Sequence, residues 1–329
     1  MDPRPLLVSL MVLLGGCTGA RTNPAPAPMA AAAPPATAAS AGGETAEVLQ
    51  RVRALNTPSS TNLITVYYTE GHQEKALRLR TVVEEAMRFY ADSLGVQAPI
   101  SLAVLDRQQW TQAGVQQPYG IPGVTGTPPV AFLPASDDNV AADDALSIRA
   151  GVGPAALRLI EASGHSYEEG ARRYVDLVGL HELGHTYSRA FGIRPAHRWL
   201  NELLATYVAY AFLRQRHPEQ ARLWDGILRG YVDAVRPRHT SLEDFNRLYF
   251  GVGPQNYVWY QARFQEMVRP AYEAKGLGFL REVRAAFPEG EASPPSMDTA
   301  LDRLERIQPG FRAWAAGLAN MTANTDAAP

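Results

Sequence analysis

The chain has 329 residues, long enough for one large domain or two subdomains with a substantial core. Apolar residues make up 46% and charged residues 19%, a balance that excludes a wholly disordered protein. The formal net charge of −2 provides no basic surface for phosphate groups, so we expect no nucleic acid partner.

Residues 1–17 have the pattern of a secretion signal. One arginine, Arg4, precedes an apolar run from Leu6 to Leu14, which is shorter than the roughly 20 residues of a membrane-spanning helix. The segment "LLGGC" resembles the bacterial lipobox, whose cysteine is lipidated and begins the mature protein. We therefore expect a lipoprotein of the bacterial cell envelope, anchored to a membrane through Cys17 on the outer-membrane or periplasmic side. A plainly secreted protein is the alternative.

Residues 18–45 are dominated by alanine and proline, which predicts a semi-extended linker without a packed core. Residues 46–165 should form an α/β subdomain. Strands are expected at 62–68, 99–105 and 130–133, and a helix with apolar residues at helical spacing is expected over 72–95.

Residues 166–320 should form a mainly helical subdomain, followed by a disordered tail over 321–329. Ser166 and Glu169 have the spacing of a capping box, which predicts a helix from there to about Ala190. A second helix is expected over 198–217. Further helices are expected at 219–235, 242–249, 255–275, 276–287 and 298–318.

The first of these helices contains the segment "HELGH". His181 and His185 lie one turn apart on the same face, so both imidazoles can bind one metal ion. Glu182 is close enough to contact a metal-bound water. The alternative is a helix with two partly exposed histidines. The apolar surroundings argue against it, and Gly184 is a poor helix former whose presence indicates a close approach to the helix backbone.

A catalytic zinc site of this kind needs a third protein ligand. The continuation with a third histidine fails, because Ser188 and Phe191 stand where glycine and histidine would be required. The segment "RWLNELLATY" on the second helix offers Glu202 instead. A short turn and an antiparallel return would bring it beside His185, which completes a set of two histidines and one glutamate.

"HELGH" followed by "WLNELLATY" resembles the gluzincin metallopeptidases, most closely the peptidase MA-like family of envelope proteins. The resemblance covers roughly residues 60 to 270 and implies a thermolysin-like zincin domain of the α+β class. It also implies Zn²⁺ as cofactor, a peptide or protein substrate, and Glu182 as general base. Leu203 departs from the family pattern, which usually has glycine there. The aminopeptidase motif Gly-x-Met-Glu-Asn is also absent.

Gluzincins usually stabilise the oxyanion with a tyrosine or histidine from the helical subdomain. "GPQNYVWYQARFQEMV" offers Tyr257 and Tyr260, and the family register favours Tyr257 as the catalytic residue, although both tyrosines read equally well as core. Asp176 or Asn201 could orient a ligand imidazole. The segment 127–135 could be the sheet edge along which a peptide lies.

The function that follows is zinc-dependent hydrolysis of peptide bonds in a cleft between the two subdomains. The alternative is a non-catalytic envelope lipoprotein that retains the zincin fold and binds a metal or a peptide. A site of two histidines and one glutamate accepts several divalent metals. The sequence leaves open the peptide specificity, the choice between endo- and exopeptidase action, and the oligomeric state.

Overall fold

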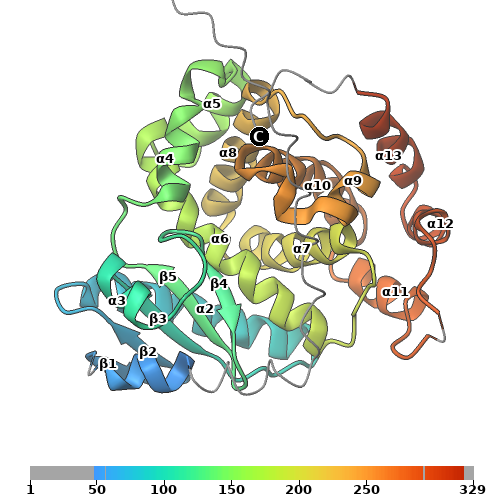
Figure 1. Cartoon of the computed structure of the whole chain (residues 1–329). Coiled ribbons are helices and arrows are strands. Elements are labelled where there is room, and N and C mark those ends of the chain that lie inside the picture. The colour runs from blue at the N-terminus through green and yellow to red at the C-terminus, as the bar shows by residue number, and fades with distance from the viewer. Residues whose placement is uncertain (1–47, 56, 292, 322–329) are drawn as a thin grey trace, which may run out of the picture. The chain divides into compact units, whose positions relative to one another are not determined.

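The computed structural model describes residues 48–55, 57–291 and 293–321. The expected signal and linker lie outside these residues, as does the tail apart from Met321. The described part combines a small five-stranded sheet with many helices, so the fold is of the expected α+β class (Figure 1). Within these described ranges no helix has the length and apolar character needed to cross a membrane.

The sheet has the strand order β1-β2-β3-β5-β4. The strands are β1 (Ser59–Thr61), β2 (Thr65–Tyr68), β3 (Ser101–Leu105), β4 (Gly123–Thr125) and β5 (Val130–Pro134). The central strands β2, β3 and β5 are parallel, whereas β1 and β4 pair antiparallel at the two edges. Sequence patterns predict the central strands only. The expectation that 127–135 lies at the sheet edge is wrong, because β4 pairs with the outer side of β5.

Both faces of the sheet are covered, because successive side chains of a strand point to opposite faces. On one face, Leu102 and Leu133 join the main core with side chains of α2 (Gln73–Leu94) and α6 (Tyr167–Ala190). On the other face, Ala103 and Phe132 join a smaller core with Trp110 of α3 (Arg107–Gln112). Burial on both faces explains why β3 and β5 are nearly continuous apolar runs, whereas burial alternates along β2.

The remaining regular elements are mainly helices. The elements are α4 (Val140–Ser147), η1 (Arg149–Gly151), α5 (Pro154–Glu161), α6, α7 (Arg198–Arg216), α8 (Pro218–Ala234), α9 (Leu242–Leu248), η2 (Tyr249–Val252), α10 (Pro254–Lys275), α11 (Gly278–Ala286), α12 (Met297–Ile307) and α13 (Phe311–Ala319). Sequence patterns do not predict α4 and α5, so the helical part begins at Val140 rather than at residue 166. The single helix expected over 298–318 is two helices, because Pro309 and Gly310 interrupt it and Gly310 has a φ of 112°.

Helices α6 and α7 pack against each other and position the expected metal ligands (Figure 1). The capping box at the start of α6 is confirmed: Ser166 Oγ accepts from the Glu169 amide, and the Glu169 carboxylate accepts from the Ser166 amide. Helix α7 is buried on nearly every side from Trp199 to Leu213, which is typical of a central helix. Leu203, at the position where the resemblance implies glycine, is fully buried in the main core.

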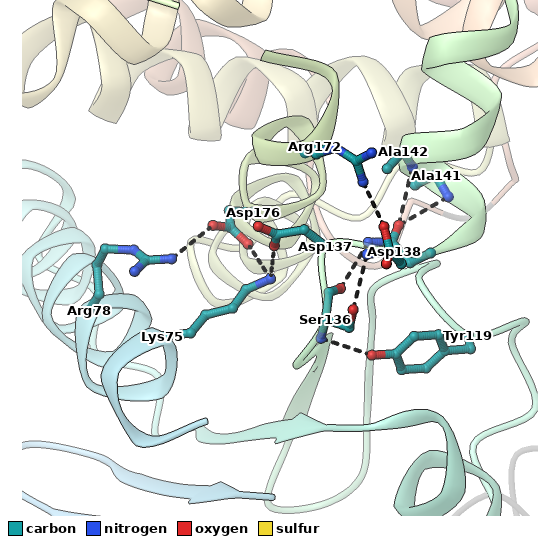
Figure 2. A network of polar contacts seen from close by, with 11 residues as sticks. Lys75, Arg78, Tyr119, Ser136, Asp137, Asp138, Ala141, Ala142, Arg172 and Asp176 are labelled. Atoms are coloured by element: carbon teal, nitrogen blue, oxygen red, sulfur yellow. Dashed lines mark hydrogen bonds and ion pairs between the residues drawn. The ribbon is translucent and has the colours of Figure 1, made fainter. Parts of the chain in front are cut away.

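Charged side chains join α2, the segment between β5 and α4, and α6 (Figure 2). The Lys75 ammonium lies 2.6 Å from Asp137 Oδ1 and 3.7 Å from Asp176 Oδ1, and Arg78 lies 3.9 Å from Asp176 Oδ2. Burial raises the pKa of Asp176, while the nearby Lys75 and Arg78 act to lower it. Asp176 therefore belongs to this network and contributes to the attachment of α2 to α6.

We expect Lys75→Ala to lower the free energy of unfolding by about 1–3 kcal/mol at pH 7, because the partly buried Asp176 carboxylate loses a cation. The loss should shrink as the pH falls through the pKa of Asp176, since a protonated carboxyl group needs no cation. Urea unfolding at several pH values measures both effects. The control is Lys275→Ala, which removes a more exposed ion pair to Glu282 and should cost at most about 1 kcal/mol. Equal losses for the two variants would contradict the prediction.

Candidate metal centre

Three side chains from α6 and α7 converge on one point. His181 Nε2 lies 3.0 Å from Glu202 Oε2, and His185 Nε2 lies 3.5 Å from Glu202 Oε1. Ligand atoms of all three residues lie within 4.8 Å of one another, and this is the single group of this kind in the described part of the chain. The predicted return of α7 therefore brings Glu202 to both histidines, and the three residues could hold a metal ion.

The donor set can be compared with the requirements of zinc. Zinc in catalytic sites takes nitrogen and oxygen ligands at about 2.0–2.2 Å, so two ligand atoms of a tetrahedral ion stand about 3.4 Å apart. The separations of 3.0 Å and 3.5 Å in this structure are close to that value. Two imidazoles and one carboxylate are also the donor types of a known class of catalytic zinc sites. The residues therefore fit zinc, although the same donors accept other divalent metals.

The Glu202 carboxylate receives three further hydrogen bonds. The Tyr249 hydroxyl donates to Oε1 at 2.6 Å, while the Tyr257 hydroxyl and the Gln261 side-chain amide donate to Oε2 at 3.0 Å and 2.8 Å. Tyr249 lies in η2, and the other two lie one turn apart on α10. These donors fix the orientation of a buried carboxylate that would otherwise be poorly solvated.

The ring of His181 is oriented by α7 itself. His181 Nδ1 lies 3.1 Å from Thr206 Oγ1, and the Thr206 hydroxyl donates to Gln261 Oε1 at 3.3 Å. A ligand imidazole commonly has such a partner on its second nitrogen. Thr206 stands four residues after Glu202, so helical spacing could have identified it. Gln261 likewise stands four residues after Tyr257, but the sequence carries no signal for Tyr249.

Burial and hydrogen bonding act in opposite directions on the titration of the site. Burial alone would raise the pKa of Glu202, but hydrogen bonds from His181 and His185 outweigh it and hold the pKa well below its usual range. Burial alone would lower the pKa of His185, and the hydrogen bond and charge of Glu202 raise it instead. Burial raises the pKa of Glu182, against the charges of both histidines. Glu182 is thus a half-buried carboxyl group within the electrostatic field of the three converging residues.

Burial, followed by the negative charge of Glu202, raises the pKa of Tyr257 well above its ordinary value. The same two causes, in the same order, raise the pKa of Tyr249. Both phenols therefore keep their protons at neutral pH and act as hydrogen-bond donors.

No protein-family model matches the chain, and no curated protein or solved structure is significantly similar to it.

The remaining candidates from the sequence lie elsewhere. Tyr260 donates to the Ser241 carbonyl at 2.8 Å, so Tyr257 is the tyrosine of the expected pair that reaches the ligands. The prediction that Asp176 orients a ligand imidazole is wrong, because its carboxylate pairs with Lys75. Thr206 rather than Asn201 contacts the His181 ring.

We expect Tyr249→Phe to weaken zinc binding by about 10–100-fold, the usual effect of removing a hydrogen bond to a ligand. The Tyr249 hydroxyl is the donor closest to the Glu202 carboxylate, and phenylalanine retains the ring but not the hydrogen bond. Competition with a zinc chelator measures the affinity. Tyr260→Phe removes a hydroxyl that points away from the site and should leave the affinity unchanged. Equal affinities for both variants would exclude a role for Tyr249 in positioning Glu202.

Proposed function

We propose that the chain is a zinc-dependent metallopeptidase of the gluzincin type with a thermolysin-like arrangement. The observation that carries the proposal is the convergence of His181, His185 and Glu202 beside the half-buried Glu182. Hydrolysis needs an acidic residue in addition to the metal ligands, and Glu182 follows the ligand His181 in the chain. A protein that only stores metal would not need this residue.

Each residue has a separate task in this proposal. His181, His185 and Glu202 would hold the zinc ion, which when bound supplies a Lewis acid that acidifies water to a pKa of about 7 and polarises a carbonyl group. Glu182 would accept a proton from the attacking water and donate it to the leaving amine, and its raised pKa suits both transfers. The Tyr257 hydroxyl, which donates to Glu202 Oε2 in this structure, would exchange that hydrogen bond for one to the oxyanion of the substrate.

The edge strand β4 would bind the substrate backbone. Its pairing with β5 leaves its other side without a strand partner in the described part of the chain, so an extended peptide could add there. Helix α6 contacts both β4 and β5, which brings this edge close to the helix that carries His181 and Glu182. The substrate would then be a peptide or protein in extended conformation.

We further propose that the protein acts in the bacterial cell envelope, attached to a membrane through a lipid on Cys17. The support is the sequence of the signal segment, with Cys17 as the only cysteine of the chain. Metabolic labelling with a palmitate analogue would detect the lipid, and Cys17→Ser should abolish the labelling.

Metal analysis and a hydrolysis assay of the full chain test the function together. We expect about one zinc ion per chain and cleavage of casein or a peptide library, both lost on treatment with a chelator and restored by zinc. Zinc binding without hydrolysis of any peptide would favour the non-catalytic metal-binding protein instead. Absence of bound metal under all conditions would exclude both functions.

A further inference from the structure

One exposed aromatic side chain stands next to the metal centre. Among the described residues the large apolar side chains that are exposed are Leu63, Ile121 and Phe250, and Phe250 is the most open at 64%. Its ring centroid lies 4.2 Å from that of Tyr249 and 5.0 Å from that of Tyr257. Since both tyrosines donate to Glu202, a single ring separates Phe250 from the ligand carboxylate.

The backbone at this point is strained. Tyr249 has φ 53° and ψ −115°, and it is the one non-glycine residue with positive φ in the described ranges. Its side chain is held on several sides: the hydroxyl donates to Glu202, and the Arg198 guanidinium lies 5.1 Å from the ring centroid. Such conformations persist where the surroundings fix them, and they are concentrated at functional sites.

Tyr249 and the next residue point into different surroundings. The Tyr249 hydroxyl reaches the buried carboxylate of Glu202, while the following ring, Phe250, remains mostly in solvent. Single exposed apolar side chains are common on protein surfaces, so the exposure of Phe250 matters because its ring lies against the two tyrosines that donate to Glu202. A ligand that covers Phe250 would bury it when bound.

We propose that Phe250 forms a subsite for an aromatic or large apolar side chain of the peptide substrate, next to the scissile bond. This inference rests on the proposed peptidase function. The exposed face of Phe250 continues the ring contacts of Tyr249 and Tyr257, and aromatic rings favour an added edge-to-face or offset-stacked partner. The substrates would therefore be peptides with phenylalanine, tyrosine, tryptophan or leucine beside the cleaved bond.

Quenched fluorescent peptides that differ at one position flanking the scissile bond test this subsite. The zinc-loaded full chain should cleave the phenylalanine peptide with a kcat/KM at least about tenfold above that of the alanine peptide, the low end of what one added apolar group contributes. Phe250→Ala should reduce this ratio to near one, and Phe250→Trp should keep it. Zinc content should be unchanged in both variants. The control is Leu63→Ala, which removes an exposed apolar side chain between β1 and β2, at the edge of the sheet opposite β4. It should retain the parent ratio.

A binding measurement separates failure of the subsite from failure of the peptidase function. Calorimetric titration with the same two peptides uses the Glu182→Gln protein, with and without Phe250→Ala. Tighter binding of the phenylalanine peptide that depends on Phe250 would support the subsite even if the parent hydrolyses nothing. If the parent cleaves peptides with a ratio that Phe250→Ala leaves unchanged, the subsite is wrong and the peptidase function stands. Equal binding of both peptides in a parent without hydrolysis would reject the subsite as well.

Discussion

Glu182→Gln should leave zinc bound and lower the rate of peptide hydrolysis by about 10²–10⁴-fold, the usual contribution of a general base. Glutamine retains the size of the side chain but cannot accept a proton from water. The three residues that would hold the metal are unchanged. Burial also raises the pKa of the Glu182 carboxyl group, which favours its neutral form. An uncharged amide at this position should therefore not disturb the fold.

The measurement is kcat/KM on a cleaved peptide, with zinc content and thermal stability determined on the same samples. Glu168→Gln is the matched control, since it makes the same substitution on an exposed residue of the first turn of α6. It should behave like the parent in all three measurements. A Glu182→Gln protein with full activity would show that another group takes the proton, whereas loss of zinc would show that Glu182 supports the metal centre instead.

The parts of the fold that the sequence predicts are those with strong local signals. The capping box and the apolar spacing define α6, and runs of β-branched, aromatic and apolar residues define the three central strands. The edge strands β1 and β4 are three residues long each, so too few side chains repeat to give a pattern. Pro309 and Gly310 are a turn signal within an apolar pattern that otherwise continues, which explains why one helix is expected where two are found.

The residues of the candidate metal site likewise differ in how far the sequence predicts them: some follow from local spacing and others depend on tertiary packing. His181 and His185 follow from helical spacing, and Glu202 follows from a short turn between two helices. Tyr249 could not be predicted, because its contact with Glu202 depends on how η2 packs on α7 and on an unusual backbone conformation. Contacts between segments distant in the chain leave no periodic pattern in the sequence.

The role of Gly184 follows partly from the local sequence and partly from tertiary packing. Its substitution should have the second of the two largest effects that we expect. A poor helix former between the two histidines predicts that something approaches the helix backbone closely. A Cβ atom at this position would stand 2.2 Å from the carbonyl oxygen of Ala205, so α7 passes directly against the glycine. Ala205 lies between Glu202 and Thr206, and this contact therefore sets the distance from the histidines to their partners on α7.

Gly184→Ala should lower the free energy of unfolding by about 1–3 kcal/mol, the range for an overpacked core, and should weaken zinc binding at the same time. The methyl group meets a backbone oxygen rather than a mobile side chain, so relief requires α6 and α7 to separate. That separation moves Glu202 away from His181 and His185, and misplaced ligands bind the ion less tightly. Denaturant unfolding of the metal-free protein and chelator competition measure the two effects.

The same helix provides the control. Gly179→Ala places a methyl group 2.6 Å from Cδ2 of Leu133, a flexible side chain that can move aside. Alanine is favoured over glycine within a helix by about 0.8–1.0 kcal/mol, which should offset much of that adjustment. We therefore expect Gly179→Ala to remain close to the parent in stability and in zinc affinity. If the two variants lost stability equally and both retained zinc, helix packing at Gly184 would not be what positions the ligands. If Gly184→Ala alone lost both, the close approach of α7 would be the structural basis of the metal centre.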